Sequence, residues 1–292
     1  MARTIKNISN HIPTILRDSM KFFISVDIEG ISGIVDNTMT SRNQGDYEKG
    51  RDLMVGDVNA AIEGILSVGP AEITVSDAHG GMNNINPNDL HPDAILVRGR
   101  PKPQSQMAGI DKTFDAAIFI GYHSMKGTNL GILSHTYSGG SIESLHINDL
   151  EVGETAMNAG IAGYYGVPLI LVAGDLAVTN ETNALDPMIH TVATKEAISR
   201  VAAKCLHPKK SRELIKAETM KAIGNMEKIK PFTFKPLITY RIRFTDAKRA
   251  DATSFMPSAT RLDGKTIIIT QSDYIKAYHG FLAAVMCATS VS

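Results

Sequence analysis

The chain has 292 residues, and its 30 lysines and arginines balance 30 aspartates and glutamates, so the formal net charge is zero. Its hydrophobic share of 43% is too high for a disordered chain, and its length suits one large α/β domain, alone or with a smaller partner. The balanced charge gives no support for binding to nucleic acid or to an anionic membrane surface. No apolar run approaches the roughly 20 residues that span a bilayer, which argues against a membrane protein.

The N-terminal segment and the cysteines bear on the cellular compartment. Residues 1–20 lack the continuous apolar region of a secretory signal, so we predict an N-terminal extension there and, by default, a cytoplasmic protein. Cys205 and Cys287 each lie in an apolar stretch of helical appearance, which predicts two small buried thiols. A disulfide scaffold and a thiolate zinc site are therefore not expected.

The first half of the chain alternates between predicted strands and helices. Apolar and polar residues alternate over 21–29, as in a strand. Residues 47–67 place apolar side chains at helical spacing, and Gly69-Pro70 ends that helix. Two strands, a short helix and a continuous apolar strand follow at 72–76, 95–97, 104–110 and 116–120. The continuous run is typical of a strand that is buried on both faces of a parallel sheet.

The second half begins with a predicted hairpin over 142–152, which turns at Asn148-Asp149. Gly153-Glu154 opens a helix rich in small residues, and a buried strand follows at 168–172. The sequence changes character after about residue 208. From there we expect a charged helix, two strands and a last helix capped by Ser272, the first three at 208–229, 237–244 and 266–270.

This order of elements predicts an α/β fold with a mainly parallel sheet flanked by helices and a smaller C-terminal α+β domain. We divide the chain into an N-terminal extension (1–20), an α/β domain that carries every candidate metal-binding and catalytic residue (21–207), and the smaller α+β domain (208–292).

Polar residues gather where three of the predicted strands end. Asp27 and Glu29 end the first strand, and His79 and His123 follow two later ones. Because ligands bind outside the carboxyl ends of the strands in open α/β sheets, these side chains should meet. Two carboxylates on one face of an extended strand repel each other unless a cation lies between them. Carboxylate oxygen with imidazole nitrogen suits zinc, manganese or cobalt better than magnesium.

Each of these residues also has an ordinary structural interpretation. An isolated Asp-x-Glu at a strand end is more often a solvated loop or a helix cap, and a single strand-end histidine is more often not a ligand. Glu154 would interact favourably with a helix N-terminus without any metal. His135, in a glycine-rich loop, would on its own be a hydrogen-bonding loop residue. Only the coincidence at one edge of the sheet favours a metal site. We assign no role to the other six histidines, His11, His91, His146, His190, His207 and His279.

Six motifs follow one another in a fixed order along the chain. They are SVDIEGISG at 25–33, SDAHGGMNN at 76–84, LHP at 90–92, FIGYH at 119–123, SH at 134–135 and VGE at 152–154. With this set, over residues 21–290, the chain resembles the zinc-dependent D-aminopeptidase family of DppA type, peptidase family M55.

The resemblance implies an activity, a site and an assembly. The activity is release of N-terminal residues, with D-amino acids favoured, from short peptides. The assembly is a ring-like homodecamer whose active sites face an inner channel. The site implied has a catalytic nucleophile at His135 and two zinc ions held by five ligands, Asp27, Glu29, His79, His123 and Glu154.

Several mechanisms and functions remain open at this point. Three carboxylates among five implied ligands fit a pair of divalent ions, and we choose Asp27 as the bridging carboxylate. His135 would attack the scissile carbonyl directly or carry a proton to the leaving amine. A dimetal hydrolase of another amide or of a phosphoester ranks lower, because no Arg or Lys lies within the three strand-end motifs. Outside enzymes, the alternative is a metal- or peptide-binding module without catalysis.

Overall fold

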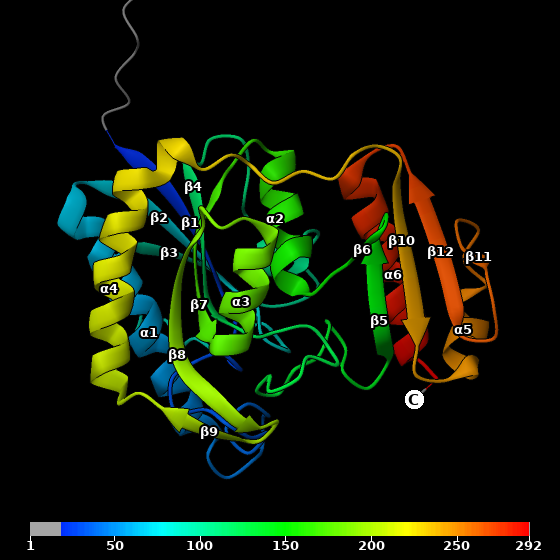
Figure 1. Ribbon diagram of the computed structural model, residues 1–292, viewed down its shortest axis with the longest axis horizontal. Helices are drawn as coiled ribbons and strands as arrows, with labels where there is room; N and C mark the ends of the chain where they lie inside the picture. The colour runs from blue at the N-terminus through cyan, green and yellow to red at the C-terminus, as the bar shows by residue number, and fades with distance from the viewer. Residues whose placement is uncertain (1–18, 292) are drawn as a thin grey trace, which may run out of the picture.

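The computed structural model describes residues 19–291, which form two β-sheets joined by helices (Figure 1). The predicted extension therefore lies, up to residue 18, outside the described residues. The larger sheet has seven strands, which are, in order across it, β3 (Ala94–Val97), β2 (Ala71–Asp77), β1 (Met20–Val26), β4 (Ala116–Tyr122), β7 (Leu169–Asp175), β8 (His190–Ser199) and β9 (Ala202–Cys205).

All neighbours in this sheet are parallel except β8 and β9. Strands β1, β2 and β3 follow one another toward one edge of the sheet, and β4 then pairs with the other side of β1. This reversal is a topological switch point, where an open α/β sheet leaves a crevice at its carboxyl edge. Strands β4 and β7 are buried along their whole length, which explains their continuous apolar sequences.

Helices cover both faces of the larger sheet. On one face, α1 (Tyr47–Val68) and α4 (Pro208–Asn225) pack against each other; on the other lie α2 (Glu154–Tyr164) and α3 (Leu176–Leu185) (Figure 1). The apolar stripe of α1 is buried as its spacing predicts, at Met54, Val58, Ala61 and Ile65. Two 3-10 helices, η1 (Ser105–Met107) and η2 (Met226–Lys228), complete this half. No helix within 19–291 has the length and apolarity needed to cross a bilayer.

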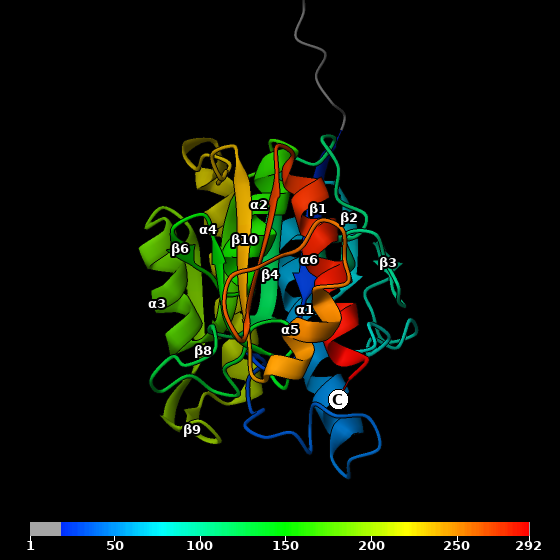
Figure 2. The same cartoon turned by 90° about the vertical axis from the view of Figure 1, so that its right-hand side faces the viewer.

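The smaller sheet is antiparallel and lies beside α2 (Figures 1 and 2). Its strands are, in order, β11 (Thr260–Arg261), β12 (Thr266–Gln271), β10 (Ile238–Phe244), β5 (Ile142–Ile147) and β6 (Leu150–Glu151), and its helices are α5 (Ala247–Thr253) and α6 (Tyr274–Thr289). Phe281 of α6 packs on Tyr240 of β10, with ring centroids 5.3 Å apart. Because α6 also contacts α2, it joins the two halves of the molecule.

The two sheets divide the chain differently from the predicted boundary at 207/208, which stays a prediction about domains. Strands β5 and β6 come from the predicted first domain but pair within the smaller sheet. Helix α4 comes from the predicted second domain but packs against α1 beside the larger sheet. The change of composition at residue 208 marks the start of α4, a charged surface helix. Its buried residues Ile215 and Ala222 nevertheless pack into the core beside the larger sheet.

The α/β class and the mainly parallel sheet are confirmed, with three local corrections. Cys205 is exposed on β9 rather than buried in a helix, and Cys287 lies in α6 but is only partly buried. The last helix is capped by Asp273, not Ser272, through a hydrogen bond that the Lys276 amide donates. Five elements were not predicted at all, namely α3, β8, β9, α5 and β11.

Gly163 of α2 provides a test of how tightly the link between the sheets is packed. A Cβ at this position would lie 1.8 Å from the Phe232 carbonyl oxygen, so the backbone would have to move. We expect Gly163→Ala to lower the free energy of unfolding by about 1–3 kcal/mol in urea denaturation. Gly224→Ala in α4, where a Cβ meets nothing within 4 Å, should instead raise it by about 0.5–1 kcal/mol. Equal effects of the two substitutions would contradict this account.

Candidate metal centre

The structure brings the strand-end side chains together at the switch point. Asp27 and Glu29 follow β1, while His79 and His123 follow its two neighbours, β2 and β4. The prediction that the two carboxylates lie on an extended strand is wrong, because β1 ends at Val26. The chain turns after it, as the Ile31 amide donates to the Ile28 carbonyl at 3.1 Å, and this turn aims both carboxylates at His79.

His79 lies between two carboxylates. Its Nδ1 atom is 3.1 Å from Asp27 Oδ1 and 3.1 Å from Glu29 Oε2. The other oxygen of Asp27, Oδ2, is 3.5 Å from His123 Nε2. Asp27 therefore presents one oxygen to each histidine and lies at the middle of the cluster.

The cluster continues from His123 to Glu154 and His135. His123 Nε2 is 3.3 Å from Glu154 Oε1, and His135 Nε2 is 3.8 Å from the same oxygen. The two imidazole rings stack, with centroids 4.0 Å apart and an angle of 16° between their planes. Six side chains from the ends of three strands, one helix and one loop thus form a continuous group. The atoms of two sets, Asp27, Glu29 and His123, and His123, His135 and Glu154, are close enough to share an ion.

All three histidines are held by a backbone carbonyl. His79 donates from Nε2 to Thr40, at 2.9 Å. His123 and His135 donate from Nδ1 to the carbonyls of Ser124 and Leu133, at 3.0 and 2.9 Å. Since a neutral imidazole has one N–H, the nitrogen that faces the carboxylates carries the lone pair in the neutral form of each ring, which is the form that binds a metal ion. A carbonyl that fixes the far nitrogen is the usual support of a metal-ligating histidine.

Two atoms in the middle of the cluster lack hydrogen bonds. Glu29 Oε2 and His123 Nε2 are buried and have no hydrogen-bond partner. Buried polar atoms are normally hydrogen-bonded, whereas these two have only ion-pair contacts, at 3.1 Å to His79 Nδ1 and 3.3 Å to Glu154 Oε1, and need another explanation. A divalent cation supplies one, because both are ligand atoms that zinc accepts.

The charge balance of the cluster also calls for a cation. Burial raises the pKa of Asp27 to about 7, and the charge of Glu29 adds to this. Burial lowers the pKa of His123, but Glu154 and Asp27 outweigh it and raise the value to about 10. In the absence of another cation, the cluster thus holds protons on its imidazoles. His135 differs, because burial and the positive charge of His123 lower its pKa and leave it neutral at neutral pH.

Comparison with known proteins assigns a family to this arrangement. The model of the D-aminopeptidase family, peptidase M55, matches residues 20–283. The chain belongs to the D-aminopeptidase family. A D-aminopeptidase of Bacillus subtilis (strain 168) is 38% identical over 274 residues, which are 94% of this chain and 99% of the relative. The solved structure of the Zn-dependent D-aminopeptidase DppA from Bacillus subtilis, described as a self-compartmentalizing protease, matches with a TM-score of 0.90 and 38% identity. That match covers 92% of this chain and 98% of DppA.

Members of the D-aminopeptidase family are peptide hydrolases, and in this member a buried network supports Glu154. The Gln106 amide donates to Glu154 Oε2, and the Tyr137 backbone amide donates to Oε1 at 2.7 Å. Asn158 holds Gln106 Oε1 at 2.7 Å and the Tyr122 hydroxyl at 2.9 Å. None of these supporting residues was predicted from the sequence. Only Asn158 carried a signal, because it is a polar residue one turn after Glu154 on a helix of small and apolar residues.

Lys195 of β8 anchors the turn that carries Asp27 and Glu29, and it too was missed. Its buried ammonium donates to the carbonyls of Glu29, Ile31 and Ile34 at 2.5, 2.8 and 2.5 Å. The neighbouring Thr194 hydroxyl donates to the Gly30 carbonyl at 2.7 Å. Four carbonyls of a tight turn thus accept hydrogen bonds from two residues of β8, which fixes the position of the turn.

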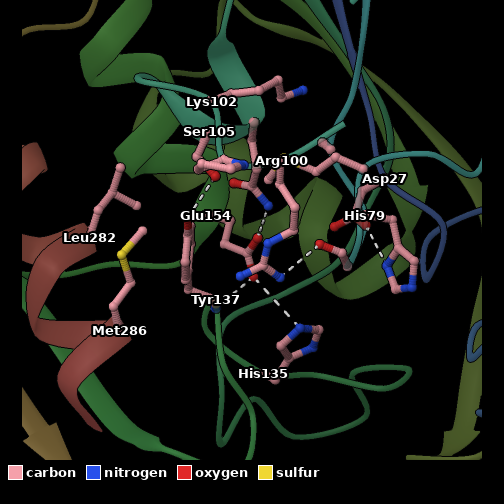
Figure 3. A pocket seen from close by; sticks show the side chains of 15 residues that line it. Asp27, His79, Arg100, Lys102, Ser105, His135, Tyr137, Glu154, Leu282 and Met286 are labelled. Atoms are coloured by element: carbon pink, nitrogen blue, oxygen red, sulfur yellow. Dashed lines mark hydrogen bonds and ion pairs between the residues drawn. The ribbon is translucent and has the colours of Figure 1, made fainter. Parts of the chain in front are cut away.

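Two cavities open onto the cluster and share His79 and His135. The first, of about 180 Å³, contains Asp27 and Glu154 and is bounded by Arg100, Lys102 and the α6 residues Leu282 and Met286 (Figure 3). The second, of about 650 Å³, contains Glu29 and is lined by Lys126 and Arg200. The absence of Arg and Lys from the strand-end motifs therefore does not mean that the site lacks cations, since the fold supplies them from other loops.

Substituting Lys195 tests its role as the anchor of the turn. We expect Lys195→Met to lower the free energy of unfolding by at least about 1–3 kcal/mol, because buried carbonyls lose their donor. Zinc affinity, measured by calorimetric titration, should fall as well. Lys204→Met is the matched control on β9, where the lysine is exposed and 3.5 Å from Glu196, and should change stability by less than about 0.5 kcal/mol. Full stability and zinc affinity of the Lys195 variant would refute the role.

Proposed function

We propose that this chain is a two-zinc aminopeptidase that releases N-terminal residues, with D-amino acids favoured, from short peptides. The observation that carries the proposal is the convergence of three carboxylates with three imidazoles whose free nitrogens all face them. The proposed metal ligands are Asp27, Glu29, His79, His123 and Glu154.

Asp27 is the proposed bridge between the two ions. Its two oxygens face different histidines, His79 at 3.1 Å and His123 at 3.5 Å, so each oxygen belongs to a different half of the cluster. Glu29 completes the half with His79, and Glu154 completes the half with His123. Three carboxylates offset most of the 4+ charge of two divalent ions, which limits the electrostatic cost of burying them.

The chemistry of the site divides between the ions and the chain. When bound, a pair of divalent ions polarises a scissile carbonyl and lowers the pKa of a water molecule. His135 is the proposed catalytic residue. Its Nδ1–H is fixed on the Leu133 carbonyl, so the lone pair of Nε2 points toward the cluster, 3.8 Å from Glu154 Oε1. Because the ring is neutral, Nε2 can attack the carbonyl or take up a proton and deliver it to the leaving amine.

The assembly and the cellular location are also proposals. The Bacillus relative is described as self-compartmentalizing, which supports an oligomer for this chain, and we propose a homodecamer with its sites facing an inner channel. Such a channel admits short peptides and excludes folded proteins. We propose a cytoplasmic location for this assembly.

A dimetal phosphoester hydrolase is the second candidate function. Arg100 and Lys102 in the first cavity favour it, because Arg and Lys beside a metal site stabilise the charge of a transferring phosphoryl group. The family assignment favours peptide hydrolysis. A metal- or peptide-binding module without catalysis predicts equilibrium peptide binding with no product.

Metal removal tests the proposed function directly. The purified chain, stripped with a chelator and then refilled with zinc, is assayed on D-alanyl-D-alanine and L-alanyl-L-alanine. We expect release of D-alanine that disappears on stripping and returns with zinc. Turnover of the L-dipeptide alone would overturn the stereochemical preference but keep the reaction. Turnover of neither dipeptide would reject the aminopeptidase, and a phosphoester would be the next substrate to test.

Two substitutions separate catalysis from metal binding. His135→Ala should retain both zinc ions, measured by elemental analysis, and lose at least about 100-fold in kcat, the range of a lost general base. Asp27→Asn should lose zinc, because the amide removes the bridging charge. Near-normal turnover of the His135 variant would exclude that residue from the mechanism, and full zinc occupancy of the Asp27 variant would exclude the bridge.

A further inference from the structure

Two cationic side chains of the first cavity have no part in the aminopeptidase chemistry proposed above. Arg100 and Lys102 come from the loop between β3 and η1, and both line the cavity that contains Asp27, His79 and Glu154. In Figure 3 the guanidinium of Arg100 extends in front of these residues, whereas Lys102 lies above Ser105 and its ammonium points away from Glu154. Their positions in the cavity suit them to bind part of a ligand.

The charges of both residues are free of an acidic partner. Arg100 donates only to the Gly80 carbonyl, at 3.3 Å, and Lys102 donates to Ser76 Oγ and the Asp77 carbonyl at 2.9 and 2.7 Å. Within residues 19–291 neither forms an ion pair. The Asp77 carboxylate, which interacts electrostatically with Lys102, accepts hydrogen bonds from the backbone amides of Asn84 and Ile85. Because their hydrogen-bond acceptors are all neutral, neither side chain has its positive charge neutralised by a hydrogen-bonded carboxylate.

The loop that carries both cations lies next to a proposed metal ligand. Gly80, the contact of Arg100, directly follows His79. In a dipeptide the C-terminal carboxylate lies one residue beyond the scissile bond, and one residue spans about 3.5 Å. The cavity, of about 180 Å³, is also smaller than the roughly 300–1,000 Å³ of ordinary ligand pockets.

The lining of the cavity fits a short peptide. Asp27 and Glu154 line it as proposed metal ligands, so this part of the cavity would take the scissile carbonyl and the N-terminal amine beside it. Arg100 and Lys102 line the cavity from the neighbouring loop, and Leu282 and Met286 of α6 form an apolar wall (Figure 3). An extended dipeptide has this same arrangement of an ammonium, a small apolar body and a carboxylate.

We infer that Arg100, supported by Lys102, binds the C-terminal carboxylate of the substrate, so that the site selects peptides of two or three residues with a free C-terminus. The guanidinium suits this task because its parallel N–H groups match both oxygens of a carboxylate. The inference rests on the proposed aminopeptidase function and specifies its substrate class.

The test compares two forms of one substrate. The zinc-loaded full chain is assayed on D-alanyl-D-alanine and on its C-terminal amide, and the initial rate of substrate loss is followed for both. We expect the free acid to be preferred at least about tenfold in kcat/KM, because the amide cannot form the charge-assisted hydrogen bonds that a carboxylate forms with Arg100. Arg100→Met should raise KM for the acid and bring its kcat/KM down to that of the amide.

Two matched arginines serve as controls. Arg98 lies two residues away and donates to the Asn83 carbonyl outside the cavity, so Arg98→Met should keep the preference for the acid. Arg200 lines the second cavity, and its substitution by Met distinguishes the two places where a carboxylate could bind. Loss of the preference in the Arg200 variant, but not in the Arg100 variant, would move the carboxylate to the second cavity and overturn the inference.

The outcomes also separate this inference from the proposed function. Equal cleavage of acid and amide by the unaltered chain overturns the inference and leaves the aminopeptidase intact. Cleavage of neither form overturns both. Competition by inorganic phosphate at micromolar concentration, lost in the Arg100 variant and without any preference for the free acid, would assign the two cations to a phosphoester instead.

Discussion

Three carboxylates buried in one cluster set the constraint that the rest of this site has to satisfy. Asp27, Glu29 and Glu154 are each at most 5% exposed, and burying a carboxylate without compensation is strongly unfavourable. The imidazoles around them compensate only if they hold one orientation. The fold provides this through backbone carbonyls that engage the far nitrogen of each ring. The cluster is therefore built to face a cation before any cation arrives, which is the preorganisation that metal sites need.

The two sheets contribute different parts of this arrangement. The parallel sheet places the proposed ligands at the ends of its strands. Lys195 of β8 holds the turn after β1 in position through hydrogen bonds to its carbonyls. The loops beyond the strands supply the cations, and the smaller sheet supplies α6, which bounds one cavity. Four of the five proposed ligands thus follow strands of the sheet and the fifth begins a helix, while the cations that line the cavities lie on loops.

The motifs made the strand-end residues predictable, because parallel strands end at a common edge and polar residues there have few structural reasons to coincide. The residues that hold the proposed ligands in place could not be predicted, for a physical reason. Lys195 meets its carbonyl partners across more than 160 positions and Gln106 meets Glu154 across 48, and no local pattern encodes such contacts. β8 escaped notice because charged residues interrupt its apolar alternation, and one of those charges is the buried lysine. Cys205 was misplaced for a related reason, since a short edge strand of small residues resembles a helix in composition.

The wall formed by α6 has a consequence for the order of events during synthesis. All five proposed ligands precede α4 in the chain, whereas β10, β12 and α6 follow it. A nascent chain that has emerged as far as α4 already carries the whole ligand set, but it lacks β10, one of the two partners of β5, and the wall beside Arg100. The proposed ligands and the wall of the substrate cavity therefore come from successive parts of the chain, and a cut between α4 and β10 would separate the wall from the ligands.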